Sequence, residues 1–458
     1  MTPIDVLPDD VLLAIFDFYV ARISHQKSDV EAWQTLVHVC RRWRCVVFGS
    51  PRRLNLRLVC TPRTPTRERL DVWPALPLII EVRILMMSVD DIVFALGYSN
   101  RICQISLHQE TRGLVWDKVL AAMQVPFPAL TRLVLQCDDE PEVIPDTFLG
   151  GSAPRLQCLE MEGVPFPGIP NLLCSATNLV HLDLHDIPDS GYISPEAMAT
   201  SLTVLTSLKT LTLDFLCSRS RPDREGRRLP PKTRSVLPNL TRLLFKGDSE
   251  YFDYLAAQID VPRLDYLSIT FFFELNFDTP HLVQLISRTP RFQEPNEAHV
   301  SLDYDAEIGL LWTSDDCERL LMRILYDDDS GPKLWCAAQA CARCLPPLPT
   351  MEELKVTNRY IYSPSQMKWK DDFEKEEWLA LLRPFTTVKN LYLSDVFQPN
   401  VASALQELVG GRTTEVLPSL KNIFLGWFEQ SGTFQEAVGQ FVDARRLSGH
   451  AIAISVWE

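Results

Sequence analysis

A chain of 458 residues is too long for one ordinary hydrophobic core, so we expect two or three domains or one extended repeat structure. Hydrophobic residues make up 46% of the chain and charged residues 23%, a balance that excludes global disorder. The net charge of −14 argues against general nucleic-acid binding, because attraction to phosphate needs a positive surface.

The sequence also argues against a membrane protein. No apolar run reaches the roughly 18 residues that cross a bilayer, and the best candidate, residues 76–87, contains Glu81 and Arg83. The first ten residues carry three aspartates and no basic residue, unlike a secretory signal or a transit peptide. We therefore expect a cytoplasmic or nuclear protein, whose twelve cysteines are small buried apolar residues.

The N-terminal region predicts two amphipathic helices. The first begins at Pro8, and its apolar residues recur at spacings of three and four: Val11, Leu12, Ile15, Phe16 and Tyr19. The second begins at Ser28 and ends at Gly49, with an apolar face of Trp33, Leu36, Val37, Cys40, Trp43 and Val47. About 45 residues seldom enclose a core of their own, so either the rest of the chain or another protein covers these faces.

Two motifs in this region resemble an F-box. Leu7-Pro8-x-Asp10-Val11-Leu12-x-x-Ile15-Phe16 is followed by Val39-Cys40-Arg41-Arg42-Trp43, which is similar to the family's Leu-Pro-x-Glu/Asp motif and its later Val-Cys-x-x-Trp motif. The resemblance covers residues 4–53, and the layout is similar to fungal, basidiomycete-type F-box proteins with a degenerate leucine-rich-repeat body. It implies docking to the Skp-type adaptor of a Skp–cullin–F-box ubiquitin ligase. The matching positions here, expected at the interface or in its support, are Leu7, Pro8, Val11, Leu12, Ile15, Val39, Cys40 and Trp43.

The N-terminal region, which we call the head, is basic although the chain as a whole is acidic. Residues 1–70 hold eleven Lys/Arg and seven Asp/Glu, so the remainder of the chain carries a net charge of −18. The basic residues concentrate between Arg41 and Arg69, and a DNA-reading helix is one interpretation of this run. We favour electrostatic steering of the adaptor, which the F-box resemblance implies to be acidic. The second predicted helix is a poor DNA reader, because its apolar face is already needed for packing.

A second feature is the recurring unit Leu-x-x-Leu-x-Leu. It starts, with substitutions, at Leu130, Leu156, Leu179, Leu208, Leu240, Leu264, Met351, Val388 and Leu420. The first six starts are separated by 26, 23, 29, 32 and 24 residues, close to the length of leucine-rich repeats. Each unit predicts a short strand and a return segment, stacked on its neighbours because it cannot bury its leucines alone.

The predicted fold is therefore α/β. An N-terminal helical F-box domain (4–53) precedes a linker with the first irregular repeats (54–125) and a leucine-rich-repeat-like solenoid (126–458) with a parallel sheet on its concave face. Residues 306–325 and 333–345 are predicted to be helical, and residues 451–457 to form a final strand. A basic segment, residues 219–234, is predicted to be an exposed loop.

Alternation along each strand predicts which residues face outward. From the outward-facing positions we select as candidate client-binding residues Arg132, Glu160, His181, Asp183, Thr212, Arg242 and Tyr266. The same polar composition is typical of any solvated sheet face, so this assignment has a plain structural alternative.

We find no motif for catalysis or for a cofactor. The nearest metal candidate is Cys336, Cys341 and Cys344, which lack a fourth ligand and favour buried thiols. The leading hypothesis is a non-catalytic substrate receptor of a ubiquitin ligase that binds an unknown client protein. The alternatives are a repeat scaffold whose head packs within the chain and has no ligase role, and an enzyme whose site forms only in three dimensions.

Overall fold

The computed structural model divides into two compact units, Met1–Ile193 and Ser194–Glu458. It describes residues 7–23, 32–60, 67, 70, 73–83, 89–109, 116–137, 142–217, 234–272, 277–302, 305–312, 318–325, 334–358, 374–394, 397–408, 412–426 and 432–457. The predicted basic loop at 219–234 therefore lies outside the described residues, apart from Arg234.

The first unit opens with three helices: α1 (Asp9–Ile23), α2 (Trp33–Val37) and α3 (Arg41–Gly49). The first predicted helix is confirmed. The prediction of one continuous second helix is wrong, because Cys40 is extended (φ −157°) and its thiol accepts the N–H of Trp43, so that α3 starts anew there. The predicted start at Ser28 lies outside the described residues.

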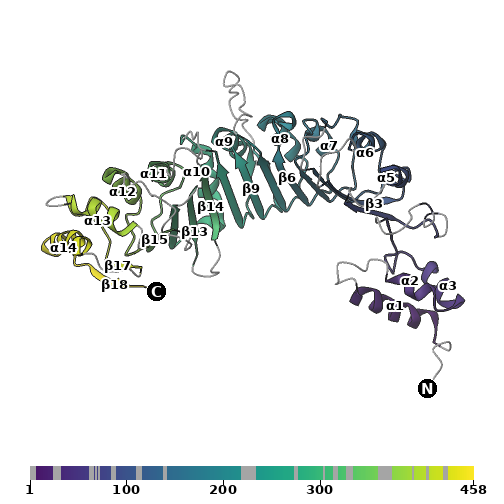
Figure 1. Ribbon diagram of the computed structural model, residues 1–458, viewed down its shortest axis with the longest axis horizontal. Coiled ribbons are helices and arrows are strands. Elements are labelled where there is room, and N and C mark those ends of the chain that lie inside the picture. The colour runs from purple at the N-terminus through teal and green to yellow at the C-terminus, as the bar shows by residue number, and fades with distance from the viewer. Residues whose placement is uncertain are drawn as a thin grey trace. The chain divides into compact units, whose positions relative to one another are not determined.

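Six strands follow in the first unit, each pairing in parallel with the next along the chain. They are β1 (Leu58–Cys60), β2 (Leu78–Arg83), β3 (Ile102–Gln109), β4 (Arg132–Cys137), β5 (Cys158–Glu162) and β6 (His181–Ile187). The connections contain α5 (Val89–Leu96), α6 (Trp116–Ala122), η3 (Phe148–Gly151), α7 (Ile169–Leu173) and η4 (Asp189–Gly191), and Figure 1 shows α5–α7 along one side of these strands. Strands β1–β3 lie within residues 54–125, where we predict irregular repeats.

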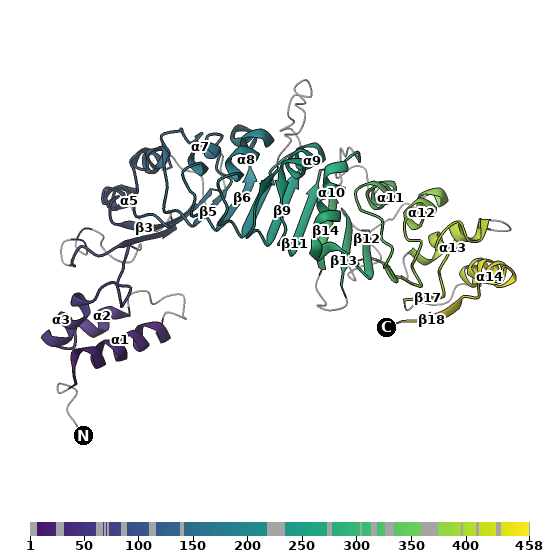
Figure 2. The same cartoon turned by 180° about the vertical axis from the view of Figure 1, so that it is seen from behind.

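The second unit continues the strand–helix alternation. Its strands lie in the order β7 (Thr210–Phe215), β9 (Arg242–Gly247), β11 (Tyr266–Phe271), β14 (Glu318–Leu325), β13 (Asp305–Leu311), β12 (Glu297–Leu302), β15 (Glu353–Thr357), β16 (Asn390–Leu393), β17 (Asn422–Leu425) and β18 (Ala453–Val456). Its helices are α8 (Pro195–Leu202), α9 (Ser249–Gln258), α10 (Pro280–Arg288), η6 (Pro290–Phe292), α11 (Leu334–Arg343), α12 (Lys375–Leu382), α13 (Gln398–Gln406) and α14 (Gly432–Leu447). Figures 1 and 2 show α9–α13 on one side of the strands, and a short pair, β8 (Ser235–Val236) with β10 (Ile259–Asp260), stands apart from this sheet.

One segment departs from the parallel pattern. Strands β12 (Glu297–Leu302), β13 (Asp305–Leu311) and β14 (Glu318–Leu325) run antiparallel to their neighbours within this group. The prediction of a helix over 306–325 is therefore wrong. Ala306, Ile308 and Leu310 on β13 are fully buried and recur at the period of two that a strand has, and Glu307 between them is buried too, so β13 is covered on both faces.

All nine Leu-x-x-Leu-x-Leu units form strands at the expected positions, so the repeat prediction is confirmed. The second leucines of successive units face one another in register, as in Leu133, Leu159 and Leu182, which are fully buried. The helix predicted at 333–345 and the final strand at 451–457 are also confirmed, as α11 and β18. The body is thus a mixed α/β leucine-rich-repeat-like structure with a mostly parallel sheet.

Several arginine side chains link one repeat to the one before it. Arg101 donates to the carbonyl of Leu76 at 3.0 Å, and Arg288 donates to the carbonyls of Ala256 (3.0 Å) and Ile259. In the last repeat, Arg445 donates to the carbonyls of Val416, Leu417 and Pro418. Each arginine reaches back about one repeat and satisfies backbone acceptors that stacking would otherwise leave without a partner.

Candidate protein-binding sites

The inner side of α1 forms the small core of the head. Leu12 and Phe16 are fully buried, and the Phe16 ring lies 4.7 Å from the Trp43 ring, centroid to centroid. Leu12 is therefore a supporting residue rather than an accessible one. These contacts fix α1 against α3 and determine which of its residues face outward.

The outer side of α1 is apolar and exposed. Val11, Ile15 and Phe18 follow one another at spacings of four and three, so they share one side of the helix, with exposures of 39%, 44% and 69%. We call these three residues the outer face of α1. Val39, in the turn between α2 and α3, is a fourth exposed apolar residue at 57%. Large apolar side chains left at the surface in one group are typical of a protein-binding site.

Arg42 fixes the start of the head. Its guanidinium donates to the Leu7 carbonyl and forms an ion pair with Asp9, at 2.7 Å between Nη2 and Oδ1. This holds the Leu-Pro segment against α3. Of the eight residues that the F-box resemblance assigns to adaptor binding, the structure exposes Pro8, Val11, Ile15 and Val39, partly exposes Leu7, Cys40 and Trp43, and buries Leu12.

Part of the apolar surface of the head is covered by later residues of the same unit. The Trp33 side chain is fully buried, and its indole N–H donates to the carbonyl of Arg57 at 3.0 Å. The Trp73 ring meets it edge-on at 5.2 Å. The chain itself therefore seals the α2 side of the head, while the outer face of α1 stays exposed.

The polar face of the sheet in the first unit brings four candidate client-binding residues together. Arg132 and Glu160 form an ion pair at 3.3 Å, and Glu160 is in register with Asp183. His181 is in register with Cys158, whose thiol accepts a hydrogen bond from Arg132. Burial raises the pKa of the Cys158 thiol and so favours its neutral form, although the positive charge of Arg132 has the opposite effect.

In the second unit, Arg242 lies over the Tyr266 ring, 4.8 Å from its centroid, because the two residues are in register on β9 and β11. Thr212 is also in this sheet, but only 6% of it is exposed. Its side chain is therefore not available to a client in this structure, because neighbouring side chains cover it.

Two side-chain ladders near the C-terminus were not among the candidates from the sequence. Lys355, Tyr392 and Phe424 are in register on β15, β16 and β17, and so are Glu353, Asn390 and Asn422. Each aromatic residue stands between the last two apolar residues of its unit. The alternation rule that we applied to the earlier repeats would have placed these residues on the polar face as well.

The three cysteines of the metal candidate are buried around α11. Burial raises the pKa of Cys341 and of Cys344, so both thiols favour the neutral form. The hydrogen bond that Thr279 donates to the Cys344 sulfur, at 3.4 Å, has the opposite and smaller effect on the pKa of Cys344. Within the described residues, no group of three or more His, Cys, Asp or Glu could hold a metal ion. Among the described helices, none combines the length and the hydrophobicity that crossing a bilayer requires.

No protein-family model matches the sequence, and no curated protein matches it. Among solved structures, it is similar to the leucine-rich repeat-containing protein LegL7 from Legionella pneumophila. The identity is 12%, the match covers 86% of this chain and 98% of that one, and the TM-score is 0.27. So low a score adds nothing to what the strands themselves show.

Proposed function

We propose that this protein is a substrate-recognition adaptor of a Skp–cullin–F-box ubiquitin ligase. The head docks the Skp-type adaptor, which connects it to the cullin, and the polar face of the repeats binds a client protein. The chain supplies no catalytic residue, because the ligase assembly promotes transfer by holding the client close. Such a protein acts in the cytoplasm or the nucleus.

The observation that carries the proposal is the outer face of α1. Val11, Ile15 and Phe18 are exposed although Leu12 and Phe16, on the same helix, are fully buried. A helix that is apolar on both of these sides needs a second covering surface. The resemblance of the Leu7–Phe16 and Val39–Trp43 motifs to an F-box supports a Skp-type adaptor as that surface.

The test is capture of a purified Skp-type adaptor by the full-length chain. We expect Ile15→Glu to lower capture on the order of tenfold or more, because a carboxylate would be buried in an apolar interface. The matched control is Asp17→Lys, which changes an exposed charge about 200° around the same helix. Wild-type protein that captures no adaptor, or Ile15→Glu protein that captures it as well as wild type, would contradict the proposal.

One observation favours the second candidate, a repeat scaffold without a ligase role. Trp33 is sealed by the Arg57 carbonyl and the Trp73 ring, so part of the head does pack within the chain. If that packing were the whole purpose of the head, the chain would stay monomeric and fail to capture any adaptor. Trp33→Phe would then lower the stability of the chain by about 1 kcal/mol, because the hydrogen bond to the Arg57 carbonyl is lost, and would change no interaction with an adaptor.

A further inference from the structure

The last repeats carry two ladders side by side on the polar face of the sheet. In the aromatic ladder, the Tyr392 and Phe424 rings stack with centroids 4.5 Å apart and planes 11° apart. Lys355 lies over Tyr392, with its Nζ atom 5.5 Å from the ring centroid. Since β15 and β17 flank β16, Lys355 and Phe424 occupy opposite sides of the Tyr392 ring.

The aromatic ladder ends at Phe424. On the next strand, the residue in register with Phe424 is Ser455, which is small and exposed. Trp457 instead meets Tyr392 edge-on at 5.7 Å, held by its indole N–H donating to the Leu393 carbonyl at 3.5 Å. Phe424 is only partly buried, and within the described residues Tyr392 is its one ring partner. A planar group over Ser455 would extend the stack.

The second ladder is polar, and its direction is fixed by chemistry. A carboxylate oxygen accepts hydrogen bonds, so the amide nitrogen of Asn390 faces Glu353, at 3.3 Å. The Asn390 oxygen then accepts from the Asn422 amide nitrogen at 2.8 Å. This leaves the Asn422 oxygen as the terminal acceptor, next to the small Ala453 in register on β18. No described residue donates to that oxygen.

The charged side chains that contact the two ladders or pair with them are Glu297, Glu353 and Lys355, with a net charge of −1. Lys355 is paired with Glu297 at 2.6 Å, whereas Glu353 has no cationic partner among the described residues. Burial is the main cause that raises the pKa of Tyr392, and the negative charge of Glu353 raises it further. The positive charge of Lys355 has the opposite effect. A cation is therefore attracted to this part of the face, and an acidic group is repelled.

We propose that the aromatic ladder and the amide ladder together form a docking site for an arginine side chain of a client protein. Its guanidinium is planar and stacks on Phe424, and its fork of N–H donors reaches the Asn422 oxygen. Phe424 and Asn422 are two residues apart on one strand, so their side chains leave the same face of the sheet, with backbone positions about 6.6 Å apart. Lysine fits less well, because its ammonium is neither planar nor forked.

This site deepens the proposed client-binding role and rests on it, and the test is independent of the ligase. Four pools of fluorescein-labelled decapeptides, random except for a central Arg, Lys, citrulline or Glu, are incubated with the full-length protein. We expect wild type to retain the Arg pool about threefold to tenfold more than the citrulline pool, which has the same shape without charge. The Glu pool should be retained least.

Two variants test the ladders separately. Glu353→Gln removes the charge that orients the amides, and Phe424→Leu removes the stacking surface, so each should reduce the Arg pool to the citrulline level. The matched control is Glu352→Gln, which removes the same charge one residue away, where the carboxylate pairs with Lys389 at 2.5 Å. If Phe424→Leu lowers the melting temperature, Glu353→Gln carries the test.

Equal retention of the Arg and citrulline pools by wild type would overturn this site, as would undiminished Arg selection by Glu353→Gln. Preferential retention of the Glu pool would overturn it too. Adaptor capture by the same proteins separates the two proposals. Arg selection that persists in a chain unable to capture an adaptor would remove the ligase role and leave this site standing.

Discussion

In the repeats, Leu133, Leu159 and Leu182 occupy equivalent positions on neighbouring strands, and none has measurable exposure. In the head, Ile15 and Phe18 lie on a helix of similar apolar character and are 44% and 69% exposed. The difference arises because each repeat is covered by the next one, whereas α2 and α3 cover only one side of α1. Stacked repeats bury one another's apolar residues, whereas a short helical unit leaves part of its apolar surface exposed.

The largest expected effect tests the stacked core. Leu267 on β11 is fully buried between Leu243 on β9 and Leu320 on β14. We expect Leu267→Ala to lower the free energy of unfolding by about 2–5 kcal/mol, through lost burial and the cavity left behind. Urea denaturation followed by circular dichroism measures this. A loss under about 1 kcal/mol would mean that stacking does not seal the repeats as the comparison requires.

A smaller effect tests the arginines that link repeats. Arg445 is fully buried and donates to the Leu417 carbonyl at 2.6 Å and to the Val416 carbonyl at 3.1 Å. Arg445→Met keeps apolar bulk but removes these donors, so we expect a loss of about 1–3 kcal/mol by the same denaturation assay.

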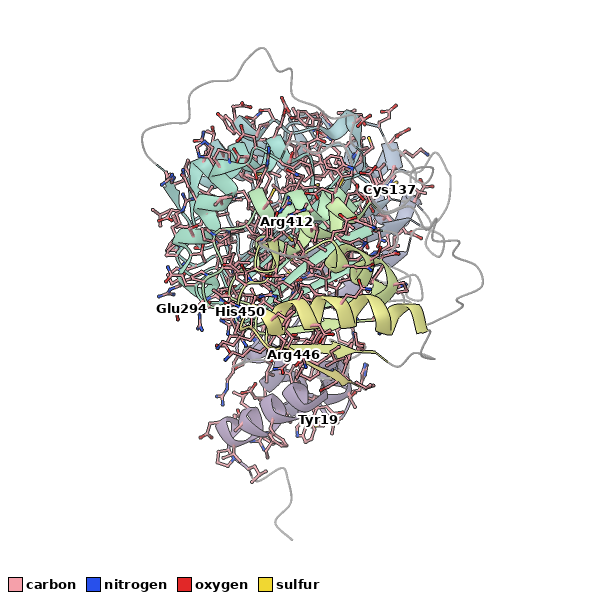
Figure 3. The ribbon with its side chains drawn as sticks, turned by 90° about the vertical axis from the view of Figure 1, so that its left-hand side faces the viewer. Tyr19, Cys137, Glu294, Arg412, Arg446 and His450 are labelled. Atoms are coloured by element: carbon pink, nitrogen blue, oxygen red, sulfur yellow. The ribbon has the colours of Figure 1, made fainter. Side chains whose placement is uncertain are left out.

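The control for that variant is Arg446→Met, which changes the next residue, labelled in Figure 3 on α14. Arg446 is exposed, and its one ion pair among the described residues is with Asp443, at 3.1 Å, so we expect a change within about 0.5 kcal/mol. Equal losses in the two variants would show that the buried carbonyl contacts contribute nothing specific.

The smallest effect sharpens the description of the head. Ile15→Ala truncates an exposed side chain, so we expect the stability of the chain alone to change by no more than about 0.5 kcal/mol. Leu12→Ala, three residues earlier, removes a fully buried side chain and should cost as much as a repeat leucine. Thermal melts of both variants make the comparison, which fails if Ile15→Ala is as destabilising as Leu12→Ala.

Much of the fold could be predicted because the spacing of apolar residues is visible within each repeat. Leu-x-x-Leu-x-Leu places apolar residues on one side of a strand, and every such unit does form one. The hairpin of β13 and β14 was not predicted, because its apolar residues do not form the Leu-x-x-Leu-x-Leu motif. The composition of residues 306–325 suggested a helix instead. The ladder of Tyr392 and Phe424 was missed for a different reason, since 32 residues separate its members and only strand register joins them.

The sequence by itself determined where the strands of the nine Leu-x-x-Leu-x-Leu units lie, that their leucines are buried, and that amphipathic helices lie within residues 9–49. These are local properties, set by spacing along the chain. Only the tertiary structure decided that Leu12 is buried and Ile15 is not, that Cys40 separates α2 from α3, and that Glu353, Asn390 and Asn422 form one chain of hydrogen bonds. The burial of Leu12 and the chain of hydrogen bonds depend on which distant segment lies alongside, and no local period specifies that. The break at Cys40 is a local cap, which the spacing of apolar residues does not reveal.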